Sequence, residues 1–265
     1  MVRQHVADGG PRNRAVSIAS DAIIGGVLAA SRYVLLDFDG PVCSIFAGRA
    51  AHFVAEDHAS QIRSLGVTVP AEVLRRGDPL DVLRYSAQLG EPTVTMTEHS
   101  LQAAELAAAE TATPAPGADE FLDACRLSDR PVALVSNNSA PAIARYLERT
   151  GLAGYVTHIE GRDPSDPALM KPHPSSVQRA VHAIGGHAEA SVLIGDSSTD
   201  LAAATAAAIR SIGYASRPAK VRALTEAGAA GLVTRMTDLA RLTATTPVTP
   251  SQASPRSAHL GEDTT

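Results

Sequence analysis

The sequence predicts an α/β protein: a parallel β-sheet flanked by helices, with one all-helical insertion. Two observations predict the sheet, because short apolar runs recur along the chain and segments of helical pattern separate them. A third observation predicts the insertion, since residues 47–112 have apolar positions at helical spacing throughout. A chain of 265 residues can form one or two domains of this kind.

Five short apolar runs are predicted to form the strands, and each is bounded by loop residues. In chain order these runs are Tyr33–Phe38, Val132–Ser136, Val192–Ile194, Ser211–Tyr214 and Gly231–Val233. The helices between the later strands are predicted at Ala140–Thr150, Pro174–Ile184, Leu201–Ala208 and Ala219–Ala227. A further short helix is predicted over Ser20–Ser31, with Ser20 or Asp21 as its N-cap.

The two ends of the chain differ from its middle. Residues 1–31 are expected to form an N-terminal extension that is loose over about its first 14 residues, because these are polar and contain Gly, Pro and Arg. Residues 245–265 are rich in Thr, Ser and Pro, have little to bury, and are expected to be a disordered tail. The core domain is then expected over residues 32–46 and 113–244, and the helical insertion over residues 47–112.

Composition argues against several classes of function. The net charge of −5, without a basic block, gives no electrostatic basis for binding nucleic acid. No apolar stretch reaches the ~20 residues that span a bilayer, and the apolar stretch near the N-terminus is interrupted by Asp21 and lacks a clean cleavage site. The two cysteines, Cys43 and Cys125, fit no metal spacing and suggest a reducing, cytoplasmic setting, with a single disulfide left open.

Polar residues gather where the predicted strands end. In chain order they are Asp37 and Asp39, Ser136 to Asn138, Lys171 in the loop MKPHP, and Asp196 and Asp200 in GDSSTD. Ligands of parallel sheets bind beyond the carboxyl ends of the strands. These side chains are therefore expected to lie together at one edge of the sheet.

Asp37 and Asp39 need a compensating partner, because burial and mutual repulsion both oppose two like charges at the end of a buried strand. A bound cation supplies one. Together with Asp196, the strand ends offer three carboxylate positions, an oxygen-ligand set of the kind that Mg²⁺ prefers. A hydroxyl (Ser136), an amide and one ammonium (Lys171) beside them would bind an anion, most simply a phosphoryl group.

These four motifs, in this order, resemble those of the haloacid dehalogenase-like (HAD) hydrolase superfamily, and within it the phosphoglycolate-phosphatase-like members with a helical cap after the first motif. Each motif is weak by itself, and the resemblance, which covers about residues 33–242, rests on all four. It implies a Rossmann-like core with a C1-type cap over residues 47–112. It also implies a Mg²⁺-dependent phosphatase that acts on a small phosphorylated metabolite through an aspartyl-phosphate intermediate, as a monomer or a homodimer.

The resemblance also implies a role for the residues that bind and transfer the phosphoryl group. Asp37 resembles the nucleophile that forms the aspartyl-phosphate. Asp39 resembles the general acid/base, which protonates the leaving oxygen and then activates water. Ser136, with the backbone of Asn137, resembles the phosphate-binding second motif. Lys171 resembles the third motif, which neutralises the nucleophile and the phosphate.

For the metal, the resemblance implies Asp37, Asp196 and the backbone carbonyl of Asp39 as ligands, with Asp200 supporting or joining them. One residue departs from the family pattern: Pro41 stands where Thr or Val is commoner, and it removes a hydroxyl and a backbone N–H from the first motif. This departure puts a local hydrogen bond in doubt and leaves the mechanism intact.

Single residues separate the neighbouring chemistries of the superfamily. Haloacid dehalogenases lack the second aspartate of the first motif, so Asp39 argues against that activity. Phosphonate-cleaving members need a cap lysine for a Schiff base, and residues 47–112 contain none. A β-phosphoglucomutase-like phosphomutase shares every core residue named above and remains an alternative. A non-catalytic binding or regulatory protein is a further alternative, which no lost motif residue supports.

Several further residues have a structural interpretation beside a functional one. At most one or two arginines of the insertion are expected to reach the site, and the candidates are Arg49, Arg75, Arg76 and Arg84. His52 and His58 could face the substrate side of the cap, and Cys43 is expected to pack at the hinge. Asp163 and Asp166 are expected in a solvated loop, and Lys220 is expected to be exposed.

Overall fold

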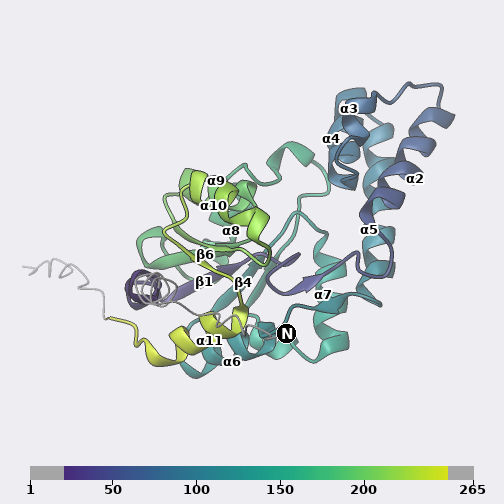
Figure 1. Cartoon of the computed structure of the whole chain (residues 1–265). Helices are drawn as coiled ribbons and strands as arrows, with labels where there is room; N and C mark the ends of the chain where they lie inside the picture. Colours follow the sequence, from purple (N-terminus) through teal and green to yellow (C-terminus); the bar gives the residue numbers. More distant parts are fainter. Residues whose placement is uncertain (1–20, 250–265) are drawn as a thin grey trace, which may run out of the picture.

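A computed structural model describes residues 21–249, and a six-stranded parallel sheet forms its centre (Figure 1). The strand order is β5-β4-β1-β6-β7-β8, and every neighbouring pair is parallel. The strands are β1 (Tyr33–Leu36), β4 (Val132–Val135), β5 (His158–Glu160), β6 (Ser191–Gly195), β7 (Arg210–Tyr214) and β8 (Gly231–Val233). This arrangement confirms the predicted α/β architecture.

Helices cover both faces of the sheet, because successive residues of each central strand point to opposite sides. Val34 and Leu36 of β1 lie in one buried apolar cluster and Leu35 lies in another. The first cluster includes helix 21–29 and the helices α6 (Ala118–Leu127), α7 (Ala140–Thr150) and α11 (Met236–Thr245). The second includes α8 (Ser175–Ala183) and α9 (Ser198–Ala206), while α10 (Pro218–Glu226) packs beside α9 and β8.

Apart from three single 3₁₀ turns, five elements of residues 21–249 lie outside the set predicted from the sequence. β5 is a three-residue strand at the edge of the sheet, half-buried throughout, so its sequence carries no apolar run. The helices α6 and α11 also were not predicted, although they pack against one another beneath the sheet. A short antiparallel ribbon of β2 (Cys43–Ser44) and β3 (Thr113–Pro114) completes the list.

The predicted N-terminal helix is present over residues 21–29, and its buried Ile24 and Leu28 pack in the main core cluster. The C-terminal end of the described chain returns to this helix, since the backbone N–H of Thr249 donates to Ala29 O at 2.8 Å. α11 ends at Thr245, where the tail was expected to begin. Ser20 as a possible N-cap, the loose first residues and most of the predicted tail lie outside the described residues.

Four helices follow one another between β2 and β3, and they form a group beside the sheet (Figure 1). They are α2 (Ala51–Ser64), α3 (Ala71–Leu74), α4 (Pro79–Leu89) and α5 (Thr93–Ala109). The group has an apolar cluster of its own, which includes Ile62 and Val82. The far end of α5, at Ala108 and Ala109, belongs instead to the main core cluster, so α5 connects the group to the sheet domain. Among residues 21–249, no helix is both long and apolar enough to cross a bilayer.

Candidate active site

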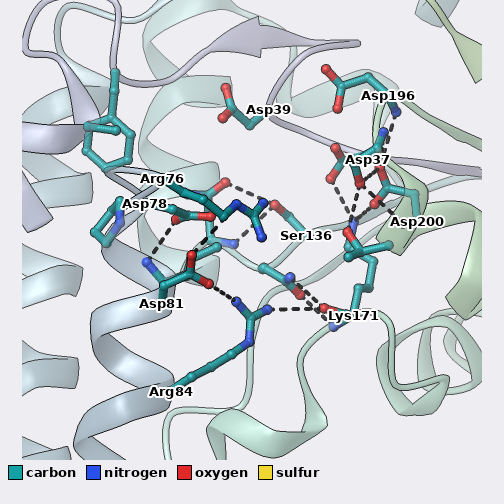
Figure 2. A pocket seen from close by; sticks show the side chains of 18 of the residues that line it. Asp37, Asp39, Arg76, Asp78, Asp81, Arg84, Ser136, Lys171, Asp196 and Asp200 are labelled. Carbon is teal, nitrogen blue, oxygen red and sulfur yellow. Dashed lines mark hydrogen bonds and ion pairs between the residues drawn. The ribbon is translucent and has the colours of Figure 1, made fainter. Parts of the chain in front are cut away.

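The polar residues of the four motifs line a single cleft of about 780 Å³ between the strand ends and helix α4 (Figure 2). The strands β1, β4 and β6, which precede three of the motifs, are neighbours in the sheet, as the sequence predicted. The motif residues that line the cleft are Asp37, Asp39, Ser136, Asn137, Lys171, Asp196 and Asp200. The structure therefore brings together every predicted site residue.

Lys171 lies at the floor of this cleft between two aspartates, and we call Asp37, Lys171 and Asp200 the cleft triad. Its Nζ donates to Asp37 Oδ1 at 2.8 Å and to Val135 O at 2.7 Å, and lies 2.5 Å from Asp200 Oδ1. The lysine side chain is only 2% exposed. Burial opposes its charge, but the charges of Asp200 and Asp37 raise the pKa of Lys171, so the lysine is fully protonated.

The carboxylates around Lys171 form a donor set that fits a divalent cation. Asp37, Asp196 and Asp200 each offer one oxygen, and these oxygens lie within 4.8 Å of one another. Burial, and after it the charge of Asp200, raises the pKa of Asp37, and burial raises the pKa of Asp196. Ionising all three carboxylates is therefore costly in this cluster, and a bound cation would lower that cost. Carboxylate oxygens are ligands that Mg²⁺ prefers, and it retains waters beside them.

Asp200 and Gly40 explain how the loops around this cluster hold their shape. Asp200 belongs to a capping box at the start of α9, where its Oδ2 accepts hydrogen bonds from Asp196 N, Ser197 N and Ser197 Oγ. Its other oxygen faces Lys171. Gly40 has φ of 119°, and a Cβ there would lie 2.2 Å from Asp196 Oδ2. Only glycine lets the first-motif loop approach Asp196 this closely.

The side chain of Asp39 points into the cleft beside this cluster without being one of its three carboxylates (Figure 2). Its Oδ1 accepts a hydrogen bond from Ile45 N at 3.0 Å, which fixes the carboxyl group. Desolvation raises the pKa of Asp39 to about 6, against the opposing effect of that hydrogen bond. A carboxyl with such a pKa can both give and take a proton near neutral pH.

Hydrogen bonds hold Ser136 and Asn137, the second-motif residues that line the same cleft. The Ser136 hydroxyl donates to Asn138 Oδ1 and accepts from Asn138 N, both at 3.1 Å. The Asn137 side chain brackets the lysine backbone, accepting from Lys171 N at 2.8 Å and donating to Lys171 O at 3.1 Å. Asn137, predicted for its backbone, therefore also positions the third-motif loop through its amide.

Helix α4 and the turn before it form the opposite wall of the cleft. The side chains there are two arginines and two aspartates: Arg76, Asp78, Asp81 and Arg84 (Figure 2). Arg84 donates to Asp81 Oδ1 at 3.1 Å and to Lys171 O at 3.2 Å, so this wall contacts the third-motif loop. Two of the four candidate arginines thus reach the cleft, as expected. Arg49 pairs with Asp57 on the surface instead.

The expectation that Lys220 is exposed is wrong. Lys220 lies in the first turn of α10, and its ammonium pairs with Asp196 Oδ2. Its side chain is partly buried because α10 begins directly after the end of β7, next to the carboxylate cluster. The helical pattern alone could not reveal this contact.

The remaining candidates have structural roles. Neither His52 nor His58 lines the cleft. His58 is buried in the helical group, where burial lowers its pKa. Asp163 accepts from Ser165 and Asp166 caps the turn at Ala168, so both hold the loop before Lys171. Cys43 is fully buried, as its packing interpretation predicted, and both cysteines are free.

Three charged residues next to the second motif were not predicted from the sequence: Glu98, Glu105 and Arg162. They form a buried ion cluster, and Glu105 also lines the cleft. In the sequence, each glutamate reads as one of many polar positions on a long helix. No signal marked them, because their partner is more than fifty residues away in the chain.

Residues 32–208 match the family model described as haloacid dehalogenase-like hydrolase. The chain is 28% identical over 193 residues to a phosphoglycolate phosphatase of Pectobacterium atrosepticum, an alignment that covers 70% of this chain and 81% of the relative. It is 36% identical over 83 residues to a phosphoglycolate phosphatase of Yersinia pseudotuberculosis, covering 31% of this chain and only 35% of that relative.

Among solved structures, the chain is similar to a β-phosphoglucomutase from Clostridium difficile, with a TM-score of 0.60 and 17% identity. The superposition covers 79% of this chain and 93% of the mutase. At this level of identity the likeness establishes a common fold and leaves the reaction open.

Proposed function

Because the chain belongs to the haloacid dehalogenase-like hydrolase family, we propose that it is a magnesium-dependent phosphatase that cleaves a small phosphomonoester through an aspartyl-phosphate intermediate. The relatives named as phosphoglycolate phosphatases support this reaction and a substrate of that class. The observation that carries the proposal is the meeting of Asp37, a buried Lys171 and the Ser136 hydroxyl in one cleft, beside further carboxylates.

Asp37 is assigned as the nucleophile. One oxygen of its carboxylate forms a bond to phosphorus while the bond from phosphorus to the leaving oxygen breaks. Lys171 Nζ, which is 2.8 Å from Asp37 Oδ1, would neutralise the charge that the carboxylate shares with the phosphoryl oxygens. The backbone N–H of Asn137 would bind those oxygens, and so would the Ser136 hydroxyl once its single hydrogen turns to them from Asn138 Oδ1.

Asp39 is assigned both proton transfers. Its carboxyl protonates the leaving oxygen in the first step. The resulting carboxylate then takes a proton from the water that attacks phosphorus, which releases phosphate and restores Asp37. A pKa of about 6, raised by desolvation, keeps both forms of Asp39 accessible near neutral pH.

The side chains of Asp37, Asp196 and Asp200, with the backbone carbonyl of Asp39, would hold the magnesium ion. Bound there, the ion would offset the charge of the phosphoryl oxygens and of the crowded carboxylates. Asp200 would serve mainly by orienting the loop, because three of the four contacts of its carboxylate are to Asp196 and Ser197.

Residues 47–112 are proposed to act as a cap that closes over the cleft, excluding water during phosphoryl transfer and admitting it for hydrolysis. The contact of Arg84 with the Lys171 carbonyl supports this role, since it joins the proposed cap to a catalytic loop. We further propose a cytoplasmic enzyme, in keeping with two buried thiols that are not in a disulfide.

The first test is phosphate release from p-nitrophenyl phosphate, phosphoglycolate and sugar phosphates, with and without Mg²⁺, beside Asp37→Asn. Mg²⁺-dependent release that the substitution abolishes is the expected result, and the ranking of the panel would identify the substrate class. No release from any ester by the folded protein would contradict hydrolysis. Interconversion of sugar phosphates would then point to a phosphomutase, and its absence to a binding protein.

A further inference from the structure

Outside the motif residues, a second buried ion cluster joins helix α5 to Arg162, which follows β5, and it contacts the loop after β4. We call Glu98, Arg162 and Glu105 the sealed triad. Arg162 Nε and Nη2 donate to the two oxygens of Glu98 at 2.7 and 2.8 Å. Its Nη1 donates to the two oxygens of Glu105 at 2.6 and 2.8 Å. The two glutamates lie seven residues apart on α5, which places them on one face of the helix.

The sealed triad is nearly closed to solvent, with only Glu105 among the residues that line the cleft, and its side-chain polar atoms have hydrogen-bond partners. The side chains are 0% (Arg162), 4% (Glu98) and 1% (Glu105) exposed. Burial opposes the arginine charge, but the two carboxylates hold the pKa of Arg162 above its usual value. One negative charge is left over, and neutral donors of the second-motif loop meet it: Glu105 accepts from Asn138 Nδ2 at 3.1 Å and from Ser139 N at 3.0 Å.

These bonds set the orientation of the Asn138 amide. A carboxylate only accepts hydrogen bonds, so the NH₂ group of Asn138 must face Glu105. The amide oxygen then faces Ser136, whose hydroxyl donates to it at 3.1 Å, while Asn138 N holds the same hydroxyl oxygen. Glu105 therefore determines, through one amide, where the Ser136 hydroxyl lies.

Arg162 holds the backbone of the same loop. Its Nη1 donates to Asn137 O at 3.1 Å and its backbone N–H donates to Asn138 O at 3.0 Å. The approach depends on Gly161, where a Cβ would lie 2.4 Å from Ala140 N and 2.9 Å from Asn138 O. The loop from Ser136 to Ser139 is thus fixed at both its side chains and its backbone.

Net stability alone does not account for such a cluster. A buried ion triad is often no more stabilising than apolar residues of similar volume, because desolvation offsets the attraction. What the charges provide here is a set of acceptors and donors at defined positions beside the phosphate-binding loop. We propose that Glu105, held by Arg162, is a positioning residue for phosphoryl binding by Ser136 and Asn137. The identity of the ligand as a phosphoryl group rests on the proposed function.

The test measures inorganic phosphate as a competitive inhibitor of p-nitrophenyl phosphate hydrolysis, together with kcat. Glu105→Gln places N–H groups opposite donors, and Asn138→Ala removes the amide that connects Glu105 to Ser136. Each substitution is expected to raise the phosphate inhibition constant about tenfold, the loss of roughly one charge-assisted hydrogen bond, while kcat changes less. The double variant should bind no more weakly than the weaker single variant, because both changes break one connection.

Two further variants separate positioning from folding. The triple variant E98L/R162M/E105L removes all three charges together, so it leaves no buried charge unpaired and is expected to stay folded and to lose phosphate affinity. Arg130→Lys is the matched control. Arg130 is also buried, but its guanidinium holds carbonyls of Ser31 and Thr246 at the other end of β4. This control is expected to lower the unfolding midpoint and to leave the inhibition constant unchanged.

A triple variant that binds phosphate as tightly as the unaltered protein would overturn the inference, and so would an equal rise of the inhibition constant in Arg130→Lys. Calorimetric titration of each variant with inorganic phosphate and Mg²⁺ measures phosphate binding directly. Because this measurement needs no turnover, it tests the inference independently of the proposed reaction. An unaltered protein that binds phosphate but hydrolyses no ester would end the proposed function and leave this inference standing if the variants lose binding.

Discussion

The cleft triad and the sealed triad have the same arrangement of charge, with two carboxylates around one buried cation. Only the cleft triad, however, lies among the residues to which we assign phosphoryl transfer. The side chains of the cleft triad are 2% (Lys171), 9% (Asp37) and 2% (Asp200) exposed, close to the values in the sealed triad. Burial and formal charge therefore do not separate the two clusters. What differs is how completely the cation satisfies its partners.

Arginine and lysine satisfy carboxylates differently. The guanidinium of Arg162 presents a planar fork that contacts all four oxygens of its two glutamates. The ammonium of Lys171 is a point charge that contacts one oxygen of each aspartate. Asp37 lines the cleft, and Asp196 adds a further carboxylate nearby. An ion cluster becomes a candidate for catalysis when its partners are left incompletely bonded beside open space.

The largest expected effect comes from removing the Asp37 carboxylate of the cleft triad. Asp37→Asn should lower kcat for phosphoester hydrolysis at least about 10⁴-fold, the scale of losing a nucleophile. The fold should persist, because burial and Asp200 already raise the pKa of Asp37 and the amide relieves that repulsion. Steady-state kinetics and circular dichroism check both parts. Residual activity near that of the unaltered protein would remove Asp37 from its assigned role.

Removing the cation from each triad should sharpen the comparison. Arg162→Met leaves two sealed glutamates without a charge partner and should cost about 3–5 kcal/mol of unfolding free energy. Lys171→Met should cost less, because the cleft carboxylates can take up a proton or a metal ion. Urea unfolding with and without Mg²⁺ measures this. Mg²⁺ is expected to recover part of the loss in Lys171→Met only, and an equal response of both variants would contradict the distinction.

Magnesium itself should stabilise the unaltered protein through the cleft carboxylates. At a hundred times its dissociation constant, a ligand adds about 2.7 kcal/mol to the unfolding free energy. Chelation should therefore lower the midpoint of thermal unfolding and stop turnover. Asp196→Asn should abolish the shift, whereas Asp166→Asn, which keeps the cap of an exposed turn, should retain it. A shift that survives in Asp196→Asn would place the ion elsewhere.

The smallest expected effect concerns Asp78, a carboxylate of the cleft wall outside both triads. Burial raises its pKa, so its charged form costs stability above that pKa. Asp78→Asn keeps the N-cap contact to Leu80 N and removes this charge. The variant should be slightly more stable at neutral pH, and the gain should vanish as the pH falls below the usual aspartate pKa, where both states are protonated. Thermal unfolding across pH would reveal the opposite slope if the charge were favourable.

The sequence predicted those features that depend on neighbouring residues. Short apolar runs followed by polar residues identified β1, β4 and β6 and the groups at their ends. The helix over Ala140–Thr150 was predicted with its observed bounds, because its apolar spacing and the following Gly151 are local signals. Elements with weak local signals were not predicted. β5 is short and half-buried, and the apolar faces of α6 and α11 are explained only by their packing on each other.

By itself, the sequence determined the parallel α/β class and the identity of the residues that meet at the strand ends, because strand pattern and motif order are written in adjacent positions. Tertiary structure alone decided which charges are buried and what each one contacts. Lys220 contacts Asp196, and Arg162 contacts Glu105 and the Ser136 loop, although these partners are far apart in the chain. Whether a charged side chain is solvated or bonded depends on desolvation and on the positions of distant partners, and no local pattern encodes either.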